Sequence, residues 1–280
     1  MGGFYGVNKW VIWTRKKPKK ICSIIDDDYV LLKKTMPCTD DKLQDYIDLL
    51  KKAKDEGVNI ATIVDYKLID GTTCTFGDHS YTVGVFLEER AKGTQMPEFE
   101  RPINSTADMW AYQTTVNDYI TELEKRAKAD QSVYDKYLED YLKLNDMGII
   151  PDPKPLNVFF DENKGYSIID VIDSKQNNHQ YFVSYILMGA FGYGIPLTYQ
   201  LSNSYYSFTT KTRYKKYEEA CKLIFEKVTK AAKKHGIEDE YIRNDLKRMN
   251  DNCFANMLVI DDNKLNIFIE NFDFKNSKER

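Results

Sequence analysis

The stretch from Ile150 to Asp173 reads I-P-D-P-K-P-L-N-V-F-F-D-E-N-K-G-Y-S-I-I-D-V-I-D and is the most informative part of this 280-residue chain. Within it, two apolar runs, Val158–Asp161 and Tyr166–Ile169, flank the turn-forming residues D-E-N-K-G. Apolar runs separated by such a turn predict a β-hairpin. A hairpin sets the residues at its open end side by side, so Asn157 and Asp170 are expected to be neighbours.

Four polar residues stand at fixed spacings around the expected hairpin. Asp152, Lys154 and Asn157 have the spacing 0, +2 and +5, and Asp170 follows Asn157 by 13 residues. Mg²⁺ is a hard cation that prefers oxygen ligands, which an asparagine and an aspartate provide.

The spacing resembles the catalytic loop and metal-binding strand of the protein-kinase superfamily, D-x-K-P-x-N followed by D-F-G. The resemblance implies an ATP- and Mg²⁺-dependent phosphotransferase. It makes Asp152 the base that orients and deprotonates the acceptor hydroxyl, and Lys154 the cation that offsets charge on the transferred group. Asn157 and Asp170 would hold Mg²⁺ against the ATP phosphates. A surface hairpin with ordinary turn residues is the alternative interpretation.

The resemblance and the order of the expected elements imply an α+β, bilobal, protein-kinase-like fold. Residues 1–92 would form the nucleotide-binding N-lobe, with five antiparallel strands and one helix. Residues 93–280 would form a mostly helical C-lobe that carries the catalytic hairpin, residues 150–173. The two lobes would make one kinase-like domain overall.

Hydrophobic periodicity places the individual elements. The N-lobe strands are expected at Lys9–Thr14, Ile21–Ile25, Tyr29–Lys34, Ala61–Ile69 and Tyr81–Glu88, with residues 70–78 joining the last two. The N-lobe helix is expected at Thr39–Glu56, with an apolar stripe of Leu43, Tyr46, Ile47, Leu50 and Ala53. The C-lobe helices are expected at Thr106–Ala129, Ser132–Asn145, Tyr181–Phe191, Tyr214–His235 and Asp239–Asn250. The hydroxyl-rich run Ser202–Thr212 is expected to be a polar loop, with an autophosphorylation target or a partner loop as the alternatives.

The resemblance also implies a lysine that grips the α- and β-phosphates and an acid that pairs with it. The residues V-L-L-K that end at Lys33 resemble the V-A-I-K pattern of the family, which nominates Lys33. Lys34, on the opposite face of the strand, is the alternative. Asp48 is the best placed acid on the following helix, and Asp45 lies one turn earlier. Both aspartates can equally be solvated helix carboxylates.

Residues 86–93 read F-L-E-E-R-A-K-G and resemble the hinge between kinase lobes, in which an acidic residue ends the fifth strand and a glycine follows five residues later, as Gly93 follows Glu88. In the family the hinge backbone hydrogen-bonds the adenine edge, so Glu88 and Arg90 would contribute main-chain groups. The phosphate-binding loop is expected at Arg15–Lys20, which has no glycine and would contact phosphates through side-chain cations. The residues from Gly3 to Gly6 are the alternative loop.

The segment that regulates ordinary protein kinases is missing from the sequence. Ile150 and Pro151 replace the His-Arg that precedes the catalytic aspartate, and that arginine normally contacts a phosphorylated activation loop. About ten residues separate Asp170 from the helix expected near Tyr181, and no A-P-E motif is present. We therefore expect no activation-loop control. Lys154 at +2 from the base is typical of the protein-kinase branch, which favours Ser/Thr hydroxyls on protein as acceptors.

Other interpretations stay open. The acceptor can be a small-molecule hydroxyl, as in aminoglycoside and choline kinases. Compact bacterial kinases of the effector type need a partner, so a protein activator is a possible requirement. The expected phosphate loop lacks glycine, and Asp48 stands where the family has a glutamate; both features favour an inactive kinase-fold scaffold. The complete motif from Asp152 to Asp170 opposes that interpretation. The fold can also transfer AMP from ATP.

Composition narrows the class of protein further. A net charge of −3 gives no broad basic surface, so nucleic acid is not an expected partner. The five scattered cysteines include no C-x-x-C pair and predict reduced thiols, so we expect a cytoplasmic location, with delivery into a host cell left open. The three histidines have no metal-ligand spacing, and no apolar run reaches the length of a membrane span.

Overall fold

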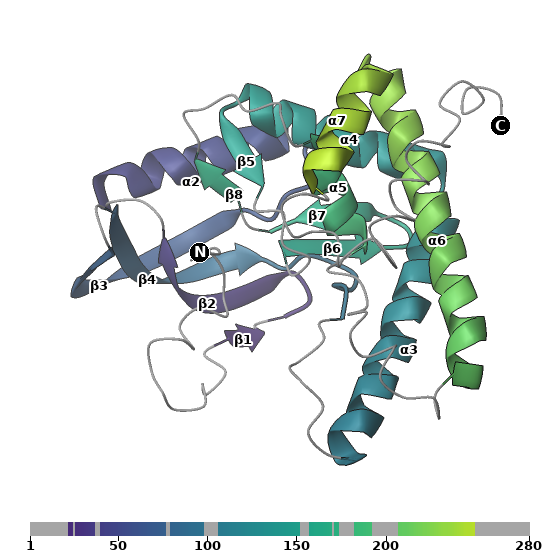
Figure 1. Ribbon diagram of the computed structural model, residues 1–280. Helices are drawn as coiled ribbons and strands as arrows, with labels where there is room; N and C mark the ends of the chain where they lie inside the picture. Colours follow the sequence, from purple (N-terminus) through teal and green to yellow (C-terminus); the bar gives the residue numbers. More distant parts are fainter. Residues whose placement is uncertain are drawn as a thin grey trace. The chain divides into compact units, whose positions relative to one another are not determined.

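The computed structural model of the chain has an α+β fold that combines helices with small antiparallel sheets (Figure 1). It describes residues 22–24, 26–36, 40–76, 79–97, 106–151, 157–169, 171–173, 182–191 and 207–249. Contacts within the chain divide it into two compact units. Unit 1 consists of Met1–Lys92, Asp140–Asp152 and Ser167–Asn177, and unit 2 consists of Gly93–Glu139, Pro153–Tyr166 and Asn178–Arg280.

The main sheet of unit 1 has four strands in the order β1-β2-β4-β3, each antiparallel to its neighbours. These strands are β1 (Cys22–Ile24), β2 (Tyr29–Met36), β3 (Ile63–Phe76) and β4 (His79–Glu89). Because β3 continues to Phe76, the expectation that residues 70–78 only join two strands is wrong. A register shift between Leu68 and Thr73 absorbs the extra residues, and β-branched threonines beyond it pair with β4.

Three of the expected features at the start of the chain lie outside the described residues. They are the strand Lys9–Thr14, the basic loop Arg15–Lys20 and the alternative glycine loop, residues 3–6. The number of strands in the N-terminal sheet and the identity of the phosphate loop therefore stay predictions.

Helix α2 (Asp40–Asp55) follows β2 in unit 1. Its expected apolar stripe is confirmed, because all five stripe residues, from Leu43 to Ala53, are buried. The chain leaves the helix at Gly57, which has a φ of 83° and whose N–H donates to the carbonyl of Lys54 at 2.8 Å. A glycine in this left-handed conformation ends a helix without steric strain.

Two three-residue strands, β5 (Ile149–Pro151) and β8 (Val171–Asp173), form a second antiparallel sheet in unit 1. The sequence patterns predict neither strand. In the observed register, Ile149 pairs with Asp173, Ile150 with Ile172, and Pro151 with Val171. The side chains of Ile149 and Val171 are buried, so the core of the unit holds this pair in place.

The expected hairpin consists of β6 (Val158–Asp161) and β7 (Gly165–Ile168), and β7 begins and ends one residue earlier than the sequence predicts. Asp161 explains the turn, because its Oδ1 accepts hydrogen bonds from the N–H groups of Asn163 at 2.9 Å and Lys164 at 3.0 Å. Gly165 then has a φ of 77°, which glycine adopts readily. The last two residues of β7 belong to unit 1 and the rest of the hairpin to unit 2.

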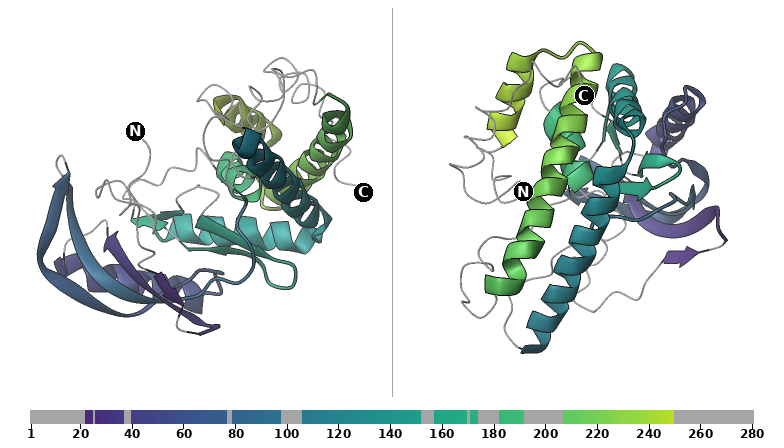
Figure 2. Two further views of the ribbon diagram at one scale, coloured as in Figure 1. Left: turned by 90° about the horizontal axis from the view of Figure 1, so that it is seen from below. Right: turned by 90° about the vertical axis from the view of Figure 1, so that its right-hand side faces the viewer.

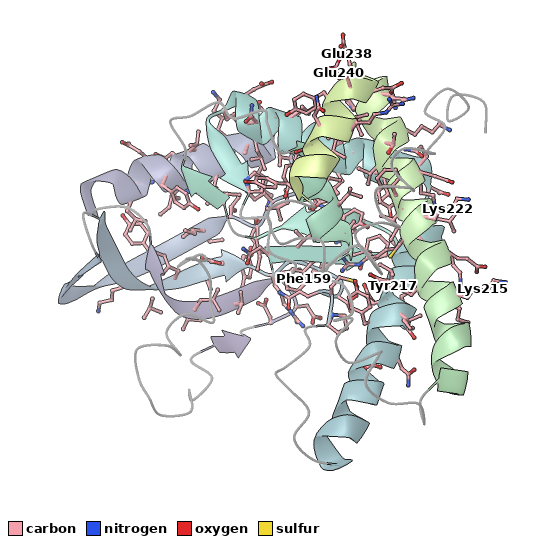
Figure 3. The ribbon with its side chains drawn as sticks, viewed as in Figure 1. Phe159, Lys215, Tyr217, Lys222, Glu238 and Glu240 are labelled. Atoms are coloured by element: carbon pink, nitrogen blue, oxygen red, sulfur yellow. The ribbon has the colours of Figure 1, made fainter. Side chains whose placement is uncertain are left out.

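Helices make up most of the described part of unit 2. They are α3 (Thr106–Lys128), α4 (Gln131–Asp146, whose residues from Asp140 onward belong to unit 1), α5 (Phe182–Phe191), α6 (Ser207–Lys234) and α7 (Asp239–Met249). Helices α3 and α6 run side by side (Figure 2), and Tyr119 on α3 packs against Tyr217 on α6 with ring centroids 6.1 Å apart. On α6, Lys215 and Lys222 point away from α3 (Figure 3).

Helix α6 corrects one expectation. It begins at Ser207, so the prediction of a polar loop is wrong for residues 207–212, which are helical. Serine and threonine are weak helix formers, and their hydroxyls favour turns when a sequence is considered alone. A helix that packs along a neighbour gains most of its stability from that packing and overrides such local preferences.

Candidate functional site

Of the four residues of the expected catalytic motif, Asn157 is described, whereas Asp152, Lys154 and Asp170 lie outside the described residues. Their immediate neighbours are described. Asp152 directly follows β5, and Asp170 directly precedes β8. The contacts of these two strands therefore show what holds the chain next to both aspartate positions.

In unit 1, hydrogen bonds fix the chain on both sides of position 170. Before it, the N–H of Ile168 donates to the carbonyl of Asn59 at 3.0 Å, and the N–H of Ala61 donates to the carbonyl of Ile168 at 2.9 Å. The N–H of Asn59 in turn donates to the buried carboxylate of Asp140 at 3.2 Å. After it, β8 pairs with β5. Position 170 thus lies between two anchored segments of backbone.

Helix α2 contacts β8 through a buried hydroxyl. Tyr46 donates from Oη to the carbonyl oxygen of Val171 at 3.0 Å, across 125 positions of sequence. Pro151, which lies opposite Val171, has no N–H and cannot supply a donor. A buried carbonyl that loses its hydrogen bond is costly, so Tyr46 stabilises β8 in its observed position.

Asn157 is buried and directly precedes β6 in unit 2. Backbone hydrogen bonds join β6 to Thr94: each N–H of Thr94 and Phe160 donates to the carbonyl of the other residue, at 2.9 Å. This close approach requires a glycine at position 93, because a Cβ there would lie 2.0 Å from the carbonyl oxygen of Phe160. Gly93 also has a φ of 96°, so both packing and backbone conformation call for glycine after the expected hinge.

Arg126 on α3 is a fully buried cation that no sequence motif marks. Its Nε donates to Oε1 of Glu122 at 3.2 Å, its Nη1 to the carbonyl of Gly189 at 2.9 Å and its Nη2 to the carbonyl of Thr94 at 2.9 Å. The guanidinium carbon also lies 5.6 Å from the centroid of the Phe160 ring. Arg126 therefore joins α3, α5 and the segment that pairs with β6.

Three tyrosines support the hairpin in unit 2. Tyr166 of β7 stacks on Tyr137 with ring centroids 4.3 Å apart, and its hydroxyl donates to the hydroxyl of Tyr134 at 3.2 Å. The hydroxyl of Tyr134 donates to the carbonyl of Arg126 at 2.9 Å. Burial raises the pKa of Tyr166 to about 12, so this hydroxyl stays protonated and remains a donor at neutral pH.

The residues expected to grip the nucleotide phosphates lie in unit 1. Lys33 and Lys34 are in β2, which pairs with β4, and their side chains lie outside the described part of the chain. Asp48 is exposed on α2, and its Oδ1 accepts a hydrogen bond from Nε2 of Gln44 at 2.8 Å. Asp45 is exposed as well. The pairing of Lys33 with either aspartate stays a prediction.

The expected hinge begins at the end of β4. Glu88 is buried within the strand, and Arg90 is exposed just after it. The N–H of Arg90 donates to the carbonyl of Asp28 at 2.7 Å, so the turn between β1 and β2 occupies this main-chain donor. Lys92 donates to Oδ1 of Asp28 at 3.0 Å, and Arg90 lies 3.6 Å from the carboxylate of Asp27. An adenine at this edge would have to use main-chain groups other than the N–H of Arg90.

Glu89, the last residue of β4, joins the sheet to α2. Its carboxylate accepts hydrogen bonds from the N–H of Thr62 at 3.1 Å and from the hydroxyl of Thr62 at 2.8 Å, and it pairs with the ammonium group of Lys54. Burial alone would raise the pKa of Glu89, but the hydrogen bonds from Lys54 and Thr62 outweigh burial and the pKa is lowered. The carboxylate is therefore ionised at neutral pH.

No protein-family model matches the chain, and neither a curated protein nor a solved structure matches it. Within the described ranges, no three His, Cys, Asp or Glu side chains come together in a group that could hold a metal ion. No described helix is long and apolar enough to cross a membrane. A functional interpretation therefore depends on the motif and on the contacts of its neighbours.

Proposed function

We propose that the chain is an ATP- and Mg²⁺-dependent phosphotransferase with a bilobal, protein-kinase-like fold. One observation carries this proposal, the register of β5 with β8. Pro151 pairs with Val171, and if this antiparallel register continued by one position, Asp152 would come opposite Asp170. Opposite residues in such a ladder have Cα atoms about 5 Å apart. The two carboxylates of the motif would then meet a ligand from adjacent positions.

In this proposal Asp170 and Asn157 hold Mg²⁺, because carboxylate and amide oxygens are donor types that this cation prefers. In the sequence, Asn157 directly precedes β6 and Asp170 follows the end of β7 by two positions. When bound, Mg²⁺ would neutralise charge on the ATP phosphates. Asp152 would take the proton of the acceptor hydroxyl, and Lys154 would offset charge on the transferred group.

The nucleotide would contact unit 1 at the positions that the family resemblance nominates. Lys33 would bind phosphate oxygens, with Asp48, the best placed acid on the following helix, as its partner. Glu88 and Arg90 would offer main-chain groups to adenine. Since the N–H of Arg90 donates to Asp28, Arg90 would contribute its carbonyl oxygen.

We expect the acceptor to be a Ser or Thr hydroxyl on protein, without activation-loop control. Strand β8 ends at Asp173 and helix α5 begins at Phe182, so the connection between them is eight residues long. A connection of this length has little room for a regulatory loop that a phosphate would order. Together with Lys154 at +2 from Asp152, it supports a protein kinase that needs no loop phosphorylation.

The test is incubation of the purified 280-residue chain with γ-labelled ATP and Mg²⁺, without added substrate, beside Asp152→Asn and Asp170→Asn. The matched control is Asp146→Asn, the same chemical change at an exposed residue of α4. We expect label on the wild type and the control only. Label on all four proteins would contradict the proposal, as would a wild type that neither takes up label nor is stabilised by ATP. Stabilisation by ATP without label would indicate a small-molecule acceptor or a missing activator.

A further inference from the structure

We propose that the exposed face of α6 binds a second copy of this chain through an antiparallel, two-fold symmetric contact. The proposal is independent of the proposed function, and it predicts a weak dimer that salt weakens further. It is based on the order of charges in four exposed residues, the charged row of α6, which are Lys215, Glu219, Lys222 and Glu226.

The charged row of α6 runs along one narrow face of the helix. Its members are four, three and four positions apart, so all four lie within about 60° of one another around the helix axis. Their side chains are between 42% and 77% exposed. Lys215 and Lys222 point away from α3 (Figure 3), so the neighbouring helix does not cover the row. This face of α6 is therefore open to a partner.

The ion pairs within the row are long. The ammonium group of Lys215 lies 3.7 Å from the carboxylate of Glu219, and that of Lys222 lies 3.9 Å from Glu226. Direct hydrogen bonds between such groups are shorter, at about 2.7–2.9 Å. In both pairs the lysine precedes the glutamate, which is the less favourable order along a helix. Stability of the isolated helix therefore accounts poorly for this order of charges.

A second copy that packs antiparallel on the row meets an opposite charge at every position. With the two-fold axis between residues 220 and 221, Lys215 lies opposite Glu226 of the second copy, and Glu219 lies opposite Lys222 of the second copy. The symmetry repeats both pairs, so no two members of the row with like charge face each other. A parallel copy in register would instead place each charge opposite its equal. The order of charges therefore favours the antiparallel contact.

Leu223 adds an apolar side chain beside the row. It is one of three large hydrophobic side chains that the described residues expose, and it is 45% exposed. The two-fold axis places Leu223 and its copy on the same edge of the contact, about 7.5 Å apart along the helix axes. A contact of about three helical turns is much smaller than a standard interface of about 1,600 Å². Association is therefore weak, and its exposed charges make it sensitive to ionic strength.

Sedimentation velocity of the purified chain, at several protein concentrations and ionic strengths, tests the contact. We expect the wild type to dimerise at low ionic strength and to dissociate as the ionic strength rises to about 0.5 M. Glu219→Lys and Lys222→Glu each place like charges opposite each other, and each should raise the dimer dissociation constant at least about tenfold. The control Lys51→Glu, the same charge change at an exposed residue of α2, should dimerise as the wild type does.

An equimolar mixture of Glu219→Lys and Lys222→Glu gives the sharpest result. We expect the mixture to associate although neither variant does so alone, because the two reversed positions then face each other with opposite charges. A defect in folding cannot produce that recovery, and thermal unfolding of each variant checks it separately. A wild type that stays monomeric at low ionic strength overturns the proposal. Dimers that both variants keep, or that mixing does not restore, also overturn it, because the contact then lies elsewhere.

Discussion

Pro151 of β5 and Val171 of β8 lie directly opposite each other in an antiparallel pair, although they are 20 positions apart in the sequence. Asp152 directly follows Pro151 in the sequence, and Asp170 directly precedes Val171. In the proposed site the two aspartates would be neighbours only if this register continued by one position. A slip of one residue would turn the side chains of a strand to the opposite face. Mutations that disturb the sheet of β5 and β8 should impair the proposed base, Asp152, and the proposed metal ligand, Asp170, together.

Gly93 offers a test of the packing between β6 and the segment that contains Gly93 and Thr94. Both Gly93 and Gly57 have positive φ values, 96° and 83°, but a Cβ at Gly57 meets nothing within 4 Å. We expect Gly57→Ala to cost about 1 kcal/mol, the conformational penalty alone. Gly93→Ala should cost at least about 3 kcal/mol, because its Cβ would also collide with the backbone of Phe160. Chemical denaturation measures both, and equal losses would contradict the close approach of Gly93 to β6.

Gly189 on α5 packs against the hydroxyl of a buried tyrosine. A Cβ at Gly189 would lie 2.0 Å from Oη of Tyr137, which is stacked on Tyr166 and cannot swing away. We expect Gly189→Ala to destabilise the chain by about 1–3 kcal/mol. In a Tyr137→Phe background the same change should cost much less, because the colliding oxygen is gone. A double-mutant cycle on unfolding free energies checks this, and additive effects would exclude the contact.

Removing only Arg126 from its buried pair with Glu122 should destabilise the chain more than removing the charge of both residues. Arg126→Met removes three hydrogen-bond donors and leaves the buried carboxylate of Glu122 without its closest cation. We expect a loss of about 3–5 kcal/mol in unfolding free energy. The double variant Arg126→Met with Glu122→Gln should recover part of that loss, since no buried charge is then left uncompensated. Failure of the second change to recover any stability would indicate that the ion pair is unimportant.

Glu89 should give the chain a defined acid-sensitive contribution to stability. Its pKa is lowered from the ordinary value of 4.5, so the folded state holds the ionised carboxylate more favourably than the unfolded state does. That contribution is fully present above the unfolded pKa and is lost as pH falls through the folded pKa. We expect Glu89→Gln to be less stable than the wild type at neutral pH, with the difference shrinking below about pH 4.5.

Thermal or chemical unfolding across this pH range measures the effect. The matched control is Glu56→Gln, at an exposed residue just after α2. A difference between wild type and Glu89→Gln that stays constant down to acid pH would show that the carboxylate's charge does not contribute. The control should show no comparable loss at neutral pH.

Much of the secondary structure could be predicted from the sequence because long elements repeat their hydrophobic signal. The stripe from Leu43 to Ala53 on α2 and the turn residues after Asp161 are examples, and both are confirmed. Strands β5 and β8 were beyond prediction because three residues contain too little alternation, and Pro151 argues against a strand when considered alone. Their pairing depends on tertiary structure, which brings together segments that the hairpin separates.

The buried residues that support the hairpin and β8 carry no motif in the sequence. Arg126 and Glu122 are charged and would ordinarily be assigned to the surface. A signal does exist, because they share one face of α3 with the buried residues Tyr119 and Leu123. Tyr46 gave no signal beyond its place in an apolar stripe, since the identity of its acceptor depends on where β8 lies. The roles of Asp152, Lys154 and Asp170 stay predictions, because these residues lie outside the described part of the chain.

The most direct test of the proposed site is the Mg²⁺ dependence of ATP binding, measured by titration calorimetry on wild type, Asp152→Asn and Asp170→Asn. We predict that Asp152→Asn binds ATP with Mg²⁺ about as tightly as the wild type, because a base is not needed for binding. Asp170→Asn should lose at least about tenfold in affinity, and only when Mg²⁺ is present. Equal binding by all three proteins, or a wild-type affinity that does not change with Mg²⁺, would contradict the assignment of Asp170 as a metal ligand.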